Sequence, residues 1–243
     1  MIHAHNLHKQ FGSVVAVDHV TFSAPDGAVT GLLGPNGAGK TTSLRMIYGL
    51  MKPVGGKVEI DGIDISTRPL EARSRIGVLP DLSGLYPRLT AREHIRYFGE
   101  LHGIERADLE RRIGKWIEIL DLGQIIDRRV AGFSHGERTK VALARAIVHN
   151  PQNILLDEPT NGLDVMSTRA VRELIRHLRA EGRCVVFSSH VMQEVSALCD
   201  RIVVMGRGKV VAEGTAEELL ALTGMASLED AFVSLVGLQG DAA

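Results

Sequence analysis

The sequence predicts an α/β fold in which helices wrap a mostly parallel β-sheet, and three observations support this prediction. From residue 28 onward, short apolar runs alternate with helical patterns. Each run stops at Gly, Asp or Ser, as strands that are buried on both faces do. A glycine-rich loop, residues 34–41, joins the first run to a helical segment. Ligands bind such sheets at the carboxyl ends of the strands, so the residues after each run are the first candidates for a site.

The parallel strands are predicted at four apolar runs. These runs are Val29–Leu33, Ile154–Leu156, Val185–Phe187 and Ile202–Met205. One helical pattern between them covers residues 139–149 and ends before the Asn150-Pro151 pair. A second covers Val165–Ala180 and is closed by Gly182.

Three regions lie outside this core. The first 27 residues predict short strands of an antiparallel edge sheet, with a turn at Pro25-Asp26-Gly27. Residues 81–135 are charged, repeat Leu and Ile at helical spacing and carry no strand signal, which predicts an inserted helical lobe. After a strand pair, Ile202–Met205 and Lys209–Ala212, helix-capping patterns at Thr215 and Ser227 predict two short helices.

The composition is that of an ordinary globular chain of 243 residues, 44% hydrophobic and 23% charged. The formal net charge of −1 provides no overall field that would attract nucleic acid. The two cysteines, Cys184 and Cys199, form no metal or disulfide pattern, which indicates small buried side chains in a reducing compartment. No signal peptide and no run of 18 apolar residues occurs, so we expect a chain that is neither exported nor membrane-spanning by itself.

The strongest chemical signal is the loop at residues 34–41, GPNGAGKT, which has the phosphate-loop pattern between a strand and a helical segment, Thr42–Leu50. Its backbone N–H groups and the helix N-terminus favour a phosphate chain. Lys40 would hold the β and γ phosphates and Thr41 a magnesium ion; the alternative is a structural strand-to-helix turn. The expected nucleotide-binding residues are Gly34, Pro35, Asn36, Gly37, Ala38, Gly39, Lys40, Thr41 and Thr42.

A second signal lies at the end of the strand Ile154–Leu156, where Asp157 and Glu158 follow. Asp157 can reach the magnesium ion through its water shell, and Glu158 can polarise the water that attacks the γ phosphate. An acidic strand end alone is more often a solvated loop or a helix cap. Together with the phosphate loop it predicts nucleotide hydrolysis with ATP and Mg²⁺.

The order of these motifs resembles the nucleotide-binding subunit of ATP-binding cassette (ABC) transporters over roughly residues 1–215. The match consists of the phosphate loop, a helical lobe, FSHGE at 133–137, LLDEP at 155–159, GLD at 162–164 and a Ser-His pair at 189–190. The resemblance implies that Ser134 and Gly136 form a signature loop that closes on ATP held by a second copy, so that the site is complete only in a dimer. Ser134 is also a helix N-cap with Glu137 as its capping-box partner.

The resemblance assigns further residues. His190 resembles the switch histidine that contacts the γ phosphate, and Asp164 the aspartate that couples the two sites, although Asp164 is equally a cap for the helix at Val165. Phe11 stands in the place of the adenine-stacking aromatic, with Val17 as a second apolar contact.

Three positions depart from the family pattern. Asp81 stands where glutamine is usual; its shorter, charged side chain can still meet magnesium through water but repels phosphates and Glu158 when the metal is absent. His135 replaces a glycine, and Glu137 replaces a glutamine.

The sequence at residues 79–103 and 155–169 resembles that of the sodium-exporter (NatA-like) branch of the family and, more loosely, that of drug exporters. This implies an ATPase subunit, residues 1–215 with the lobe at about 81–135, followed by an extension at 216–243. We expect a homodimer bound to a multi-span membrane permease at the cytoplasmic face of the cell membrane, with no nucleic acid. Leu85, Tyr86, Tyr97 and Phe98 are candidates for permease docking or for the lobe's own core. The rival hypothesis is an ABC-type ATPase that acts on ribosomes or DNA.

Overall fold

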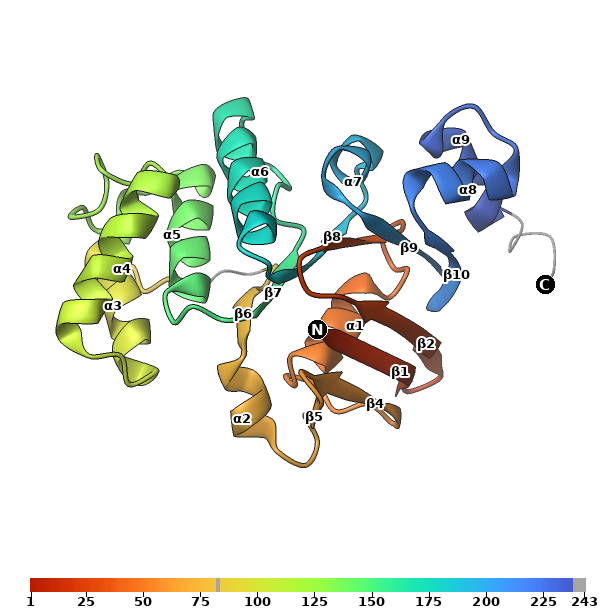
Figure 1. The fold of residues 1–243 in the computed structure, drawn as a ribbon, viewed down its shortest axis with the longest axis horizontal. Helices are drawn as coiled ribbons and strands as arrows, with labels where there is room; N and C mark the ends of the chain where they lie inside the picture. Colours follow the sequence, from red (N-terminus) through yellow and green to blue (C-terminus); the bar gives the residue numbers. More distant parts are fainter. Residues whose placement is uncertain (82–83, 238–243) are drawn as a thin grey trace.

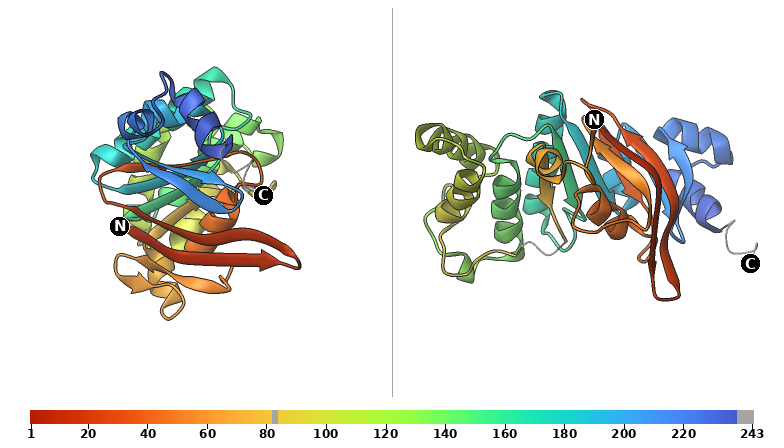
Figure 2. Two further views of the ribbon diagram at one scale, coloured as in Figure 1. Left: turned by 90° about the vertical axis from the view of Figure 1, so that its right-hand side faces the viewer. Right: turned by 90° about the horizontal axis from the view of Figure 1, so that it is seen from below.

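The computed structural model describes residues 1–81 and 84–237, and it contains two β-sheets flanked by helices (Figure 1). Residues 82–83, inside the expected lobe, and 238–243, the end of the expected extension, lie outside the described residues. Figures 1 and 2 show an elongated molecule with α3, α4 and α5 at one end and α8 and α9 at the other.

The main sheet has six strands in the order β10-β9-β3-β8-β7-β6. The five neighbouring strands from β9 to β6 pair in parallel, and β10 pairs with β9 in antiparallel fashion. Their bounds are β3 Val29–Leu33, β6 Ile76–Leu79, β7 Asn153–Asp157, β8 Cys184–Ser189, β9 Arg201–Gly206 and β10 Lys209–Gly214. The four predicted apolar runs are confirmed as strands by this pairing, and every residue in them is buried.

Helices and the second sheet cover the two faces of the main sheet. Along β3, Leu33 and Val29 face one apolar cluster while Leu32 faces the other. The first cluster is completed by α5 (His135–Ile147), α6 (Val165–Ala180) and α7 (Met192–Leu198). The second is completed by α1 (Lys40–Ile47) and the N-terminal strands. This two-faced burial explains why the strand sequences are continuous apolar runs.

The N-terminal strands form a sheet of their own, in the order β2-β1-β4-β5. The antiparallel pairing of β1 (Ile2–Phe11) and β2 (Val14–Ala24) is confirmed, but the strands are 10 and 11 residues long rather than short. Two unpredicted strands, β4 (Gly55–Ile60) and β5 (Ile63–Asp64), complete this sheet. The sequence has no apolar run at either place, because β4 contains Gly, Lys and Glu and β5 has only two residues.

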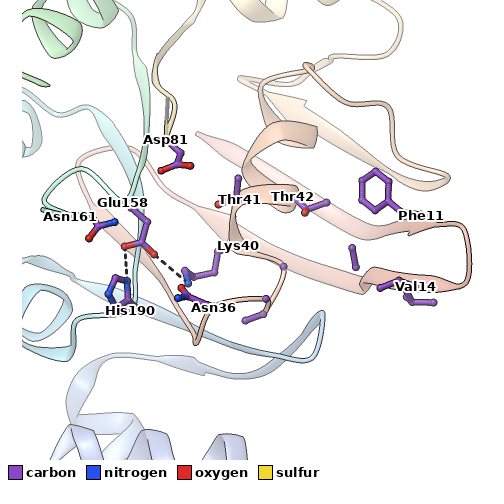
Figure 3. A pocket seen from close by; sticks show the side chains of 15 residues that line it. Phe11, Val14, Asn36, Lys40, Thr41, Thr42, Asp81, Glu158, Asn161 and His190 are labelled. Atoms are coloured by element: carbon purple, nitrogen blue, oxygen red, sulfur yellow. Dashed lines mark hydrogen bonds and ion pairs between the residues drawn. The ribbon is translucent and has the colours of Figure 1, made fainter. Parts of the chain in front are cut away.

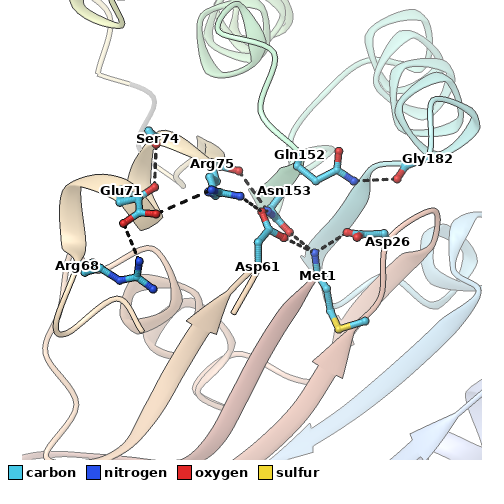
Figure 4. Close-up of polar contacts among 10 residues, drawn as sticks. All are labelled: Met1, Asp26, Asp61, Arg68, Glu71, Ser74, Arg75, Gln152, Asn153 and Gly182. Atoms are coloured by element: carbon cyan, nitrogen blue, oxygen red, sulfur yellow. Dashed lines mark hydrogen bonds and ion pairs between the residues drawn. The ribbon is translucent and has the colours of Figure 1, made fainter. Parts of the chain in front are cut away.

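A polar cluster joins the two sheets (Figure 4). Asn153, at the start of β7, donates from Nδ2 to Asp61 Oδ2 at 3.0 Å and to the Arg75 carbonyl at 3.3 Å. The amino group of Met1 donates to Asp61 Oδ1 at 2.7 Å and to Asn153 Oδ1 at 2.9 Å. The turn between β4 and β5 is therefore tied to the edge of the main sheet, where α2 (Pro69–Ser74) precedes β6.

Between β6 and α5 the described chain is helical, with α3 (Ala91–Leu101), α4 (Arg106–Ile119) and a 3₁₀ turn, η1 (Val130–Gly132). Thr90 caps α3 with a full capping box. Trp116, Ile113 and Leu120 are buried in the same apolar cluster as α5. Two helix starts differ from the prediction: α1 begins at Lys40 rather than Thr42, and α5 begins at His135 rather than 139, so both helices start inside their loop motifs.

The chain continues after β10 into α8 (Ala216–Thr223) and α9 (Leu228–Gly237). The predicted caps are confirmed: Thr215 accepts from Glu218 N at 3.1 Å, and Ser227 accepts from Asp230 N at 3.1 Å. Cys184 is fully buried, and burial raises the pKa of its thiol to about 12. Within residues 1–81 and 84–237, no single helix meets the length and hydropathy that a membrane span needs; only the bent α8–α9 pair does so jointly.

Candidate active site

The phosphate loop leaves β3 and turns into α1 through two glycines with left-handed backbone. Gly37 has φ +82° and Gly39 has φ +96°. A Cβ on Gly39 would lie 2.6 Å from the Ala16 carbonyl oxygen, so the loop packs against β2 at a distance that only glycine permits. Because α1 starts at Lys40, the lysine stands at the helix N-terminus, where free N–H groups favour an anion.

A pocket of about 660 Å³ opens beside this loop (Figure 3). Its walls come from three places: the β1–β2 hairpin, the phosphate loop with the first residues of α1, and the ends of β6, β7 and β8. Its lining is Phe11, Val14, Val15, Ala16, Asn36, Gly37, Ala38, Gly39, Lys40, Thr41, Thr42, Asp81, Glu158, Asn161 and His190. Gly34 and Pro35 lie behind this lining, where their carbonyl oxygens accept hydrogen bonds from Lys40 Nζ at 2.7 and 3.2 Å.

Three charged or titratable side chains meet in the pocket (Figure 3). Glu158 Oε1 lies 3.3 Å from Lys40 Nζ, and Glu158 Oε2 lies 2.9 Å from His190 Nδ1. The side chains of Lys40 and Glu158 are only 6% and 13% exposed, while that of His190 is 41% exposed. Both oxygens of the Glu158 carboxylate are therefore held, one by Lys40 of the phosphate loop and the other by His190 of the loop after β8.

The backbone of Glu158 is strained. Its φ of +48° lies in the left-handed region, which costs a non-glycine residue about 1–3 kcal/mol. The conformation is held by a hydrogen bond from Glu158 N to Ser188 Oγ at 2.9 Å, and by the two partners of the carboxylate. Strain of this kind is typical of residues that must point into a site.

Asp157 and Thr41 form an oxygen-rich corner that fits a magnesium ion. Thr41 Oγ1 and Ser188 Oγ both donate to Asp157 Oδ1, at 3.0 and 2.7 Å. The other oxygen, Oδ2, is buried and has no hydrogen-bond partner among the described residues. Burial raises the pKa of Asp157, and the nearby Asp81 and Glu158 carboxylates raise it further. A hard divalent cation would offset the burial of the Asp157 carboxylate and its repulsion from the carboxylates of Asp81 and Glu158. Asp81 lines the same pocket.

The hairpin provides the apolar wall of the pocket, with one correction to the prediction. Phe11 lines the pocket and is 47% exposed, so its ring is available for stacking. Val17, in contrast, is fully buried among the N-terminal strands and α1. Val17 points inward, and Val14, Val15 and Ala16 line the pocket instead.

The signature-loop residues lie outside the pocket lining. Ser134 caps α5, because its side chain accepts from Glu137 N at 3.2 Å while the Glu137 carboxylate accepts from Ser134 N at 2.7 Å. Asp164 caps α6 by accepting from Ser167 N at 2.9 Å. A Cβ on Gly136 would lie 2.2 Å from Ser167 Oγ, so the two capped helix starts are in direct contact.

Two functional residues were not predicted from the sequence. Ser188 bonds both Asp157 and the Glu158 backbone, and it lies directly opposite Asp157 in the parallel pair of β7 and β8. Asn161 lines the pocket, and its carbonyl oxygen lies 3.1 Å from His135 Nε2. The register of two neighbouring strand ends was the available signal for Ser188; the contact of Asn161 with His135 has no sequence signal.

Comparison with known proteins agrees with this geometry. Residues 17–161 match the family model described as ABC transporter. The chain is 46% identical over 207 residues to the ABC transporter ATP-binding protein NatA of Bacillus subtilis (strain 168), covering 85% of this chain and 84% of that protein. It is 34% identical to the linearmycin resistance ATP-binding protein LnrL of the same strain, covering 92% of this chain and 72% of the relative.

Solved structures give the same result. An ATP-binding subunit of an ABC transporter superposes with a TM-score of 0.90 and 30% identity, covering 97% of this chain and 99% of that one. The ABC transporter cassette MJ0796, solved as a dimer in a post-hydrolysis state with ADP and Pi, superposes with a TM-score of 0.80 and 26% identity, covering 88% and 98%.

Proposed function

The chain belongs to the ABC transporter family as an ATP-binding, ATP-hydrolysing subunit, and from this premise we propose that it drives an export permease by closing head to tail with a second copy over ATP. One relative supports the direction of transport by its name, the Nod factor export ATP-binding protein I of Paraburkholderia xenovorans, which is 38% identical over 88% of this chain.

One observation carries the catalytic part of the proposal: the strained Glu158 holds its carboxylate between Lys40 and His190 at the mouth of the phosphate loop. In this arrangement Lys40 Nζ is satisfied by protein oxygens and turns to the β and γ phosphates when ATP enters. The Glu158 carboxylate is then released to accept the proton of the attacking water, and His190 keeps that water and the carboxylate in register.

The oxygen-rich corner supplies the second requirement of phosphoryl transfer. Thr41 and Asp157, with Asp81 through water, would hold Mg²⁺, which neutralises charge on the β and γ phosphates when bound. Ser188 donates to Asp157 Oδ1, and the unpartnered Oδ2 would be available to the ion. Phe11 and Val14 would flank the adenine on the exposed side of the pocket.

The dimer part of the proposal rests on what one chain lacks. In the single chain the pocket is open, and Ser134 and Gly136 line none of it. Ser134 instead stands exposed at the N-terminus of α5, where free N–H groups can meet the γ phosphate held by a partner copy. Hydrolysis would remove the shared phosphate and let the two copies separate.

The permease would dock at a groove of about 420 Å³ between α1, β6, α3 and α5. Its walls are mostly apolar and include Tyr48, Leu50 and Phe98. The predicted docking residues divide: Phe98 lines this groove, Tyr86 and Tyr97 are exposed beside it, and Leu85 packs on the lobe's core. We propose that a cytoplasmic helix of the permease lays its apolar face here, which would hold the subunit at the cytoplasmic side of the cell membrane.

For cargo, the proposed exporter has sodium ions as its first candidate, on the resemblance to the NatA-like branch. This subunit would not select the cargo, because selectivity is set by residues that line the transport path in the permease. In the proposed division of the chain, residues 1–215 form the cassette with its helical lobe, and residues 216–243 form an extension.

The test is to trap the Glu158→Gln chain with ATP in cells, solubilise membranes in mild detergent and identify what co-purifies. The matched control carries Lys40→Ala as well, which removes the phosphate grip. Recovery of a multi-span membrane protein with the single variant only would support the proposal, and vesicles containing that partner would then distinguish sodium from other cargo. Recovery of ribosomes or DNA without a membrane protein would overturn it.

A further inference from the structure

The β1–β2 hairpin contains a bulge at its middle (Figure 2 shows the hairpin projecting from the molecule). Leu7 lies opposite Val20 and Lys9 lies opposite Val17, so His8 faces two residues of β2, Asp18 and His19. Val17 and Val20 are both fully buried although three positions separate them, which an undisturbed strand does not allow. The extra residue therefore turns Asp18 and His19 to the outer face together.

The bulge is made with a residue that is costly at its position. His19 has φ +57°, in the left-handed region where glycine is the ordinary choice. A histidine there gains no burial, because its side chain is 65% exposed. What the position provides is a contact: His19 Nδ1 lies 2.5 Å from Asp18 Oδ1. The left-handed backbone thus brings the His19 imidazole against the carboxylate of its neighbour.

The three side chains converge on one point. His8 Nδ1 lies 3.4 Å from the same Asp18 Oδ1, and the ligand atoms of His8, Asp18 and His19 all lie within 4.8 Å of one another. His8 Nδ1 is shielded from solvent and makes no hydrogen bond within the described part of the chain. For metal–ligand bonds of about 2.1 Å, the edge of a tetrahedron is about 3.4 Å, so small side-chain rotations suffice to enclose an ion.

Asp18 contributes the carboxylate of the cluster, and its two oxygens face different partners. Lys209 Nζ lies 3.3 Å from Oδ2, which leaves Oδ1 to the two imidazoles. Two imidazole nitrogens and one carboxylate oxygen are the donor set of zinc and its neighbours in the first transition row, whereas magnesium prefers oxygen alone.

We propose that His8, Asp18 and His19 form a binding site for a divalent transition-metal ion of the Zn²⁺ class, with water completing the coordination. The site is separate from the oxygen-rich corner at Asp157. It lies behind the pocket wall: Asp18 N donates to the Gly208 carbonyl at 2.8 Å, and Gly208 N donates to the Ala38 carbonyl at 3.2 Å. The ion would thus bridge β1, through His8, and β2, through Asp18 and His19. β2 also carries Val14, Val15 and Ala16, which line the pocket.

The test uses the untagged chain, freed of metal with a chelator and titrated with Co²⁺, whose visible ligand-field absorption reports tetrahedral nitrogen–oxygen coordination. The wild-type chain should bind one Co²⁺ that Zn²⁺ displaces. The His8→Ala and His19→Gly variants should each weaken binding by more than about tenfold, because loss of even an outer-shell partner costs that much. His3→Ala and His5→Ala, on the same strand but outside the cluster, should bind normally.

His19→Gly also separates loss of the site from loss of the fold. Glycine suits the left-handed backbone, so without metal this variant should unfold at the same temperature as the wild type or higher. Zn²⁺ should raise the unfolding temperature of the wild type and leave that of His19→Gly unchanged. A wild-type chain that binds no Co²⁺, or variants at His8 and His19 that bind it as the wild type does, would overturn the proposal.

Discussion

Gly136 lies where the starts of α5 and α6 touch, and replacing it with alanine tests that contact. A Cβ at this position would lie 2.2 Å from Ser167 Oγ, 2.9 Å from Ser167 Cβ and 3.3 Å from Asp164 Oδ2. The hydroxyl can rotate away only by giving up its 2.8 Å hydrogen bond to Asp164, and the Ser167 Cβ is fixed to the helix backbone. The methyl group must therefore push the two helix starts apart.

The expected loss follows from these contacts. Overpacking costs about 2 kcal/mol, and the lost hydrogen bond about 1 kcal/mol. Replacing a helical glycine returns about 1 kcal/mol, so Gly136→Ala should lower the free energy of unfolding by about 2 kcal/mol. Urea denaturation measures this value as a lower midpoint at unchanged slope.

The chain offers a matched control in α4. A Cβ on Gly114 meets no described atom within 4 Å, so Gly114→Ala should raise the free energy of unfolding by about 0.5–1 kcal/mol. Adding Ser167→Ala to Gly136→Ala removes the closest clashing atom and should recover part of the loss. The reasoning is refuted if Gly136→Ala is as stable as Gly114→Ala.

Three further predictions concern the pocket and pH. Glu158→Gln should lower the ATPase rate by about 10²–10⁴-fold while nucleotide affinity changes little, because glutamine keeps the shape but cannot take the proton; a rate within tenfold of the wild type would contradict this. Phe11→Ala should weaken ATP binding by about tenfold or more in equilibrium titrations. Val17→Ala should leave ATP affinity unchanged and lower the free energy of unfolding by about 2 kcal/mol. Weaker ATP binding in Val17→Ala but not in Phe11→Ala would show that Val17, and not Phe11, contacts the nucleotide. Burial, aided by Arg145, lowers the pKa of His94 from 6.5 to about 4. As pH falls, His94 therefore takes up a proton in the unfolded chain before it does so in the folded chain. Its contribution to the free energy of unfolding is complete above pH 6.5 and should fall by up to about 3 kcal/mol towards pH 4. His94→Gln should flatten this pH dependence.

The parallel sheet could be predicted from the sequence because burial on both faces leaves a simple trace. Strands such as Val29–Leu33 are apolar at every position, and the alternation of their side chains between two clusters does not interrupt the run. β4 leaves no such trace, because Lys57 and Glu59 alternate with its buried residues Val58 and Ile60. Its pairing with β1 depends on residues about 50 positions away, which local patterns do not contain.

The site was predictable where a motif fixes its own geometry, as in the phosphate loop, and less so where geometry comes from a neighbour. The inward turn of Val17 depends on the bulge at Asp18 and His19, which shifts the alternation of β2. The strain at Glu158 depends on Ser188, a residue of the adjacent strand. Sequence patterns predicted the residue types of the site, but not which of them face the pocket.

The central claim is that ATP closes two copies of this chain head to tail, and sedimentation velocity of the Glu158→Gln variant tests it most directly. Without nucleotide the variant should sediment as a monomer, and with ATP and Mg²⁺ as a dimer. Adding Lys40→Ala should abolish the dimer by removing ATP, and Ser134→Arg should abolish it while ATP binding is retained. A Glu158→Gln chain that binds ATP and stays monomeric at every concentration, or a dimer that survives Ser134→Arg, would contradict the account.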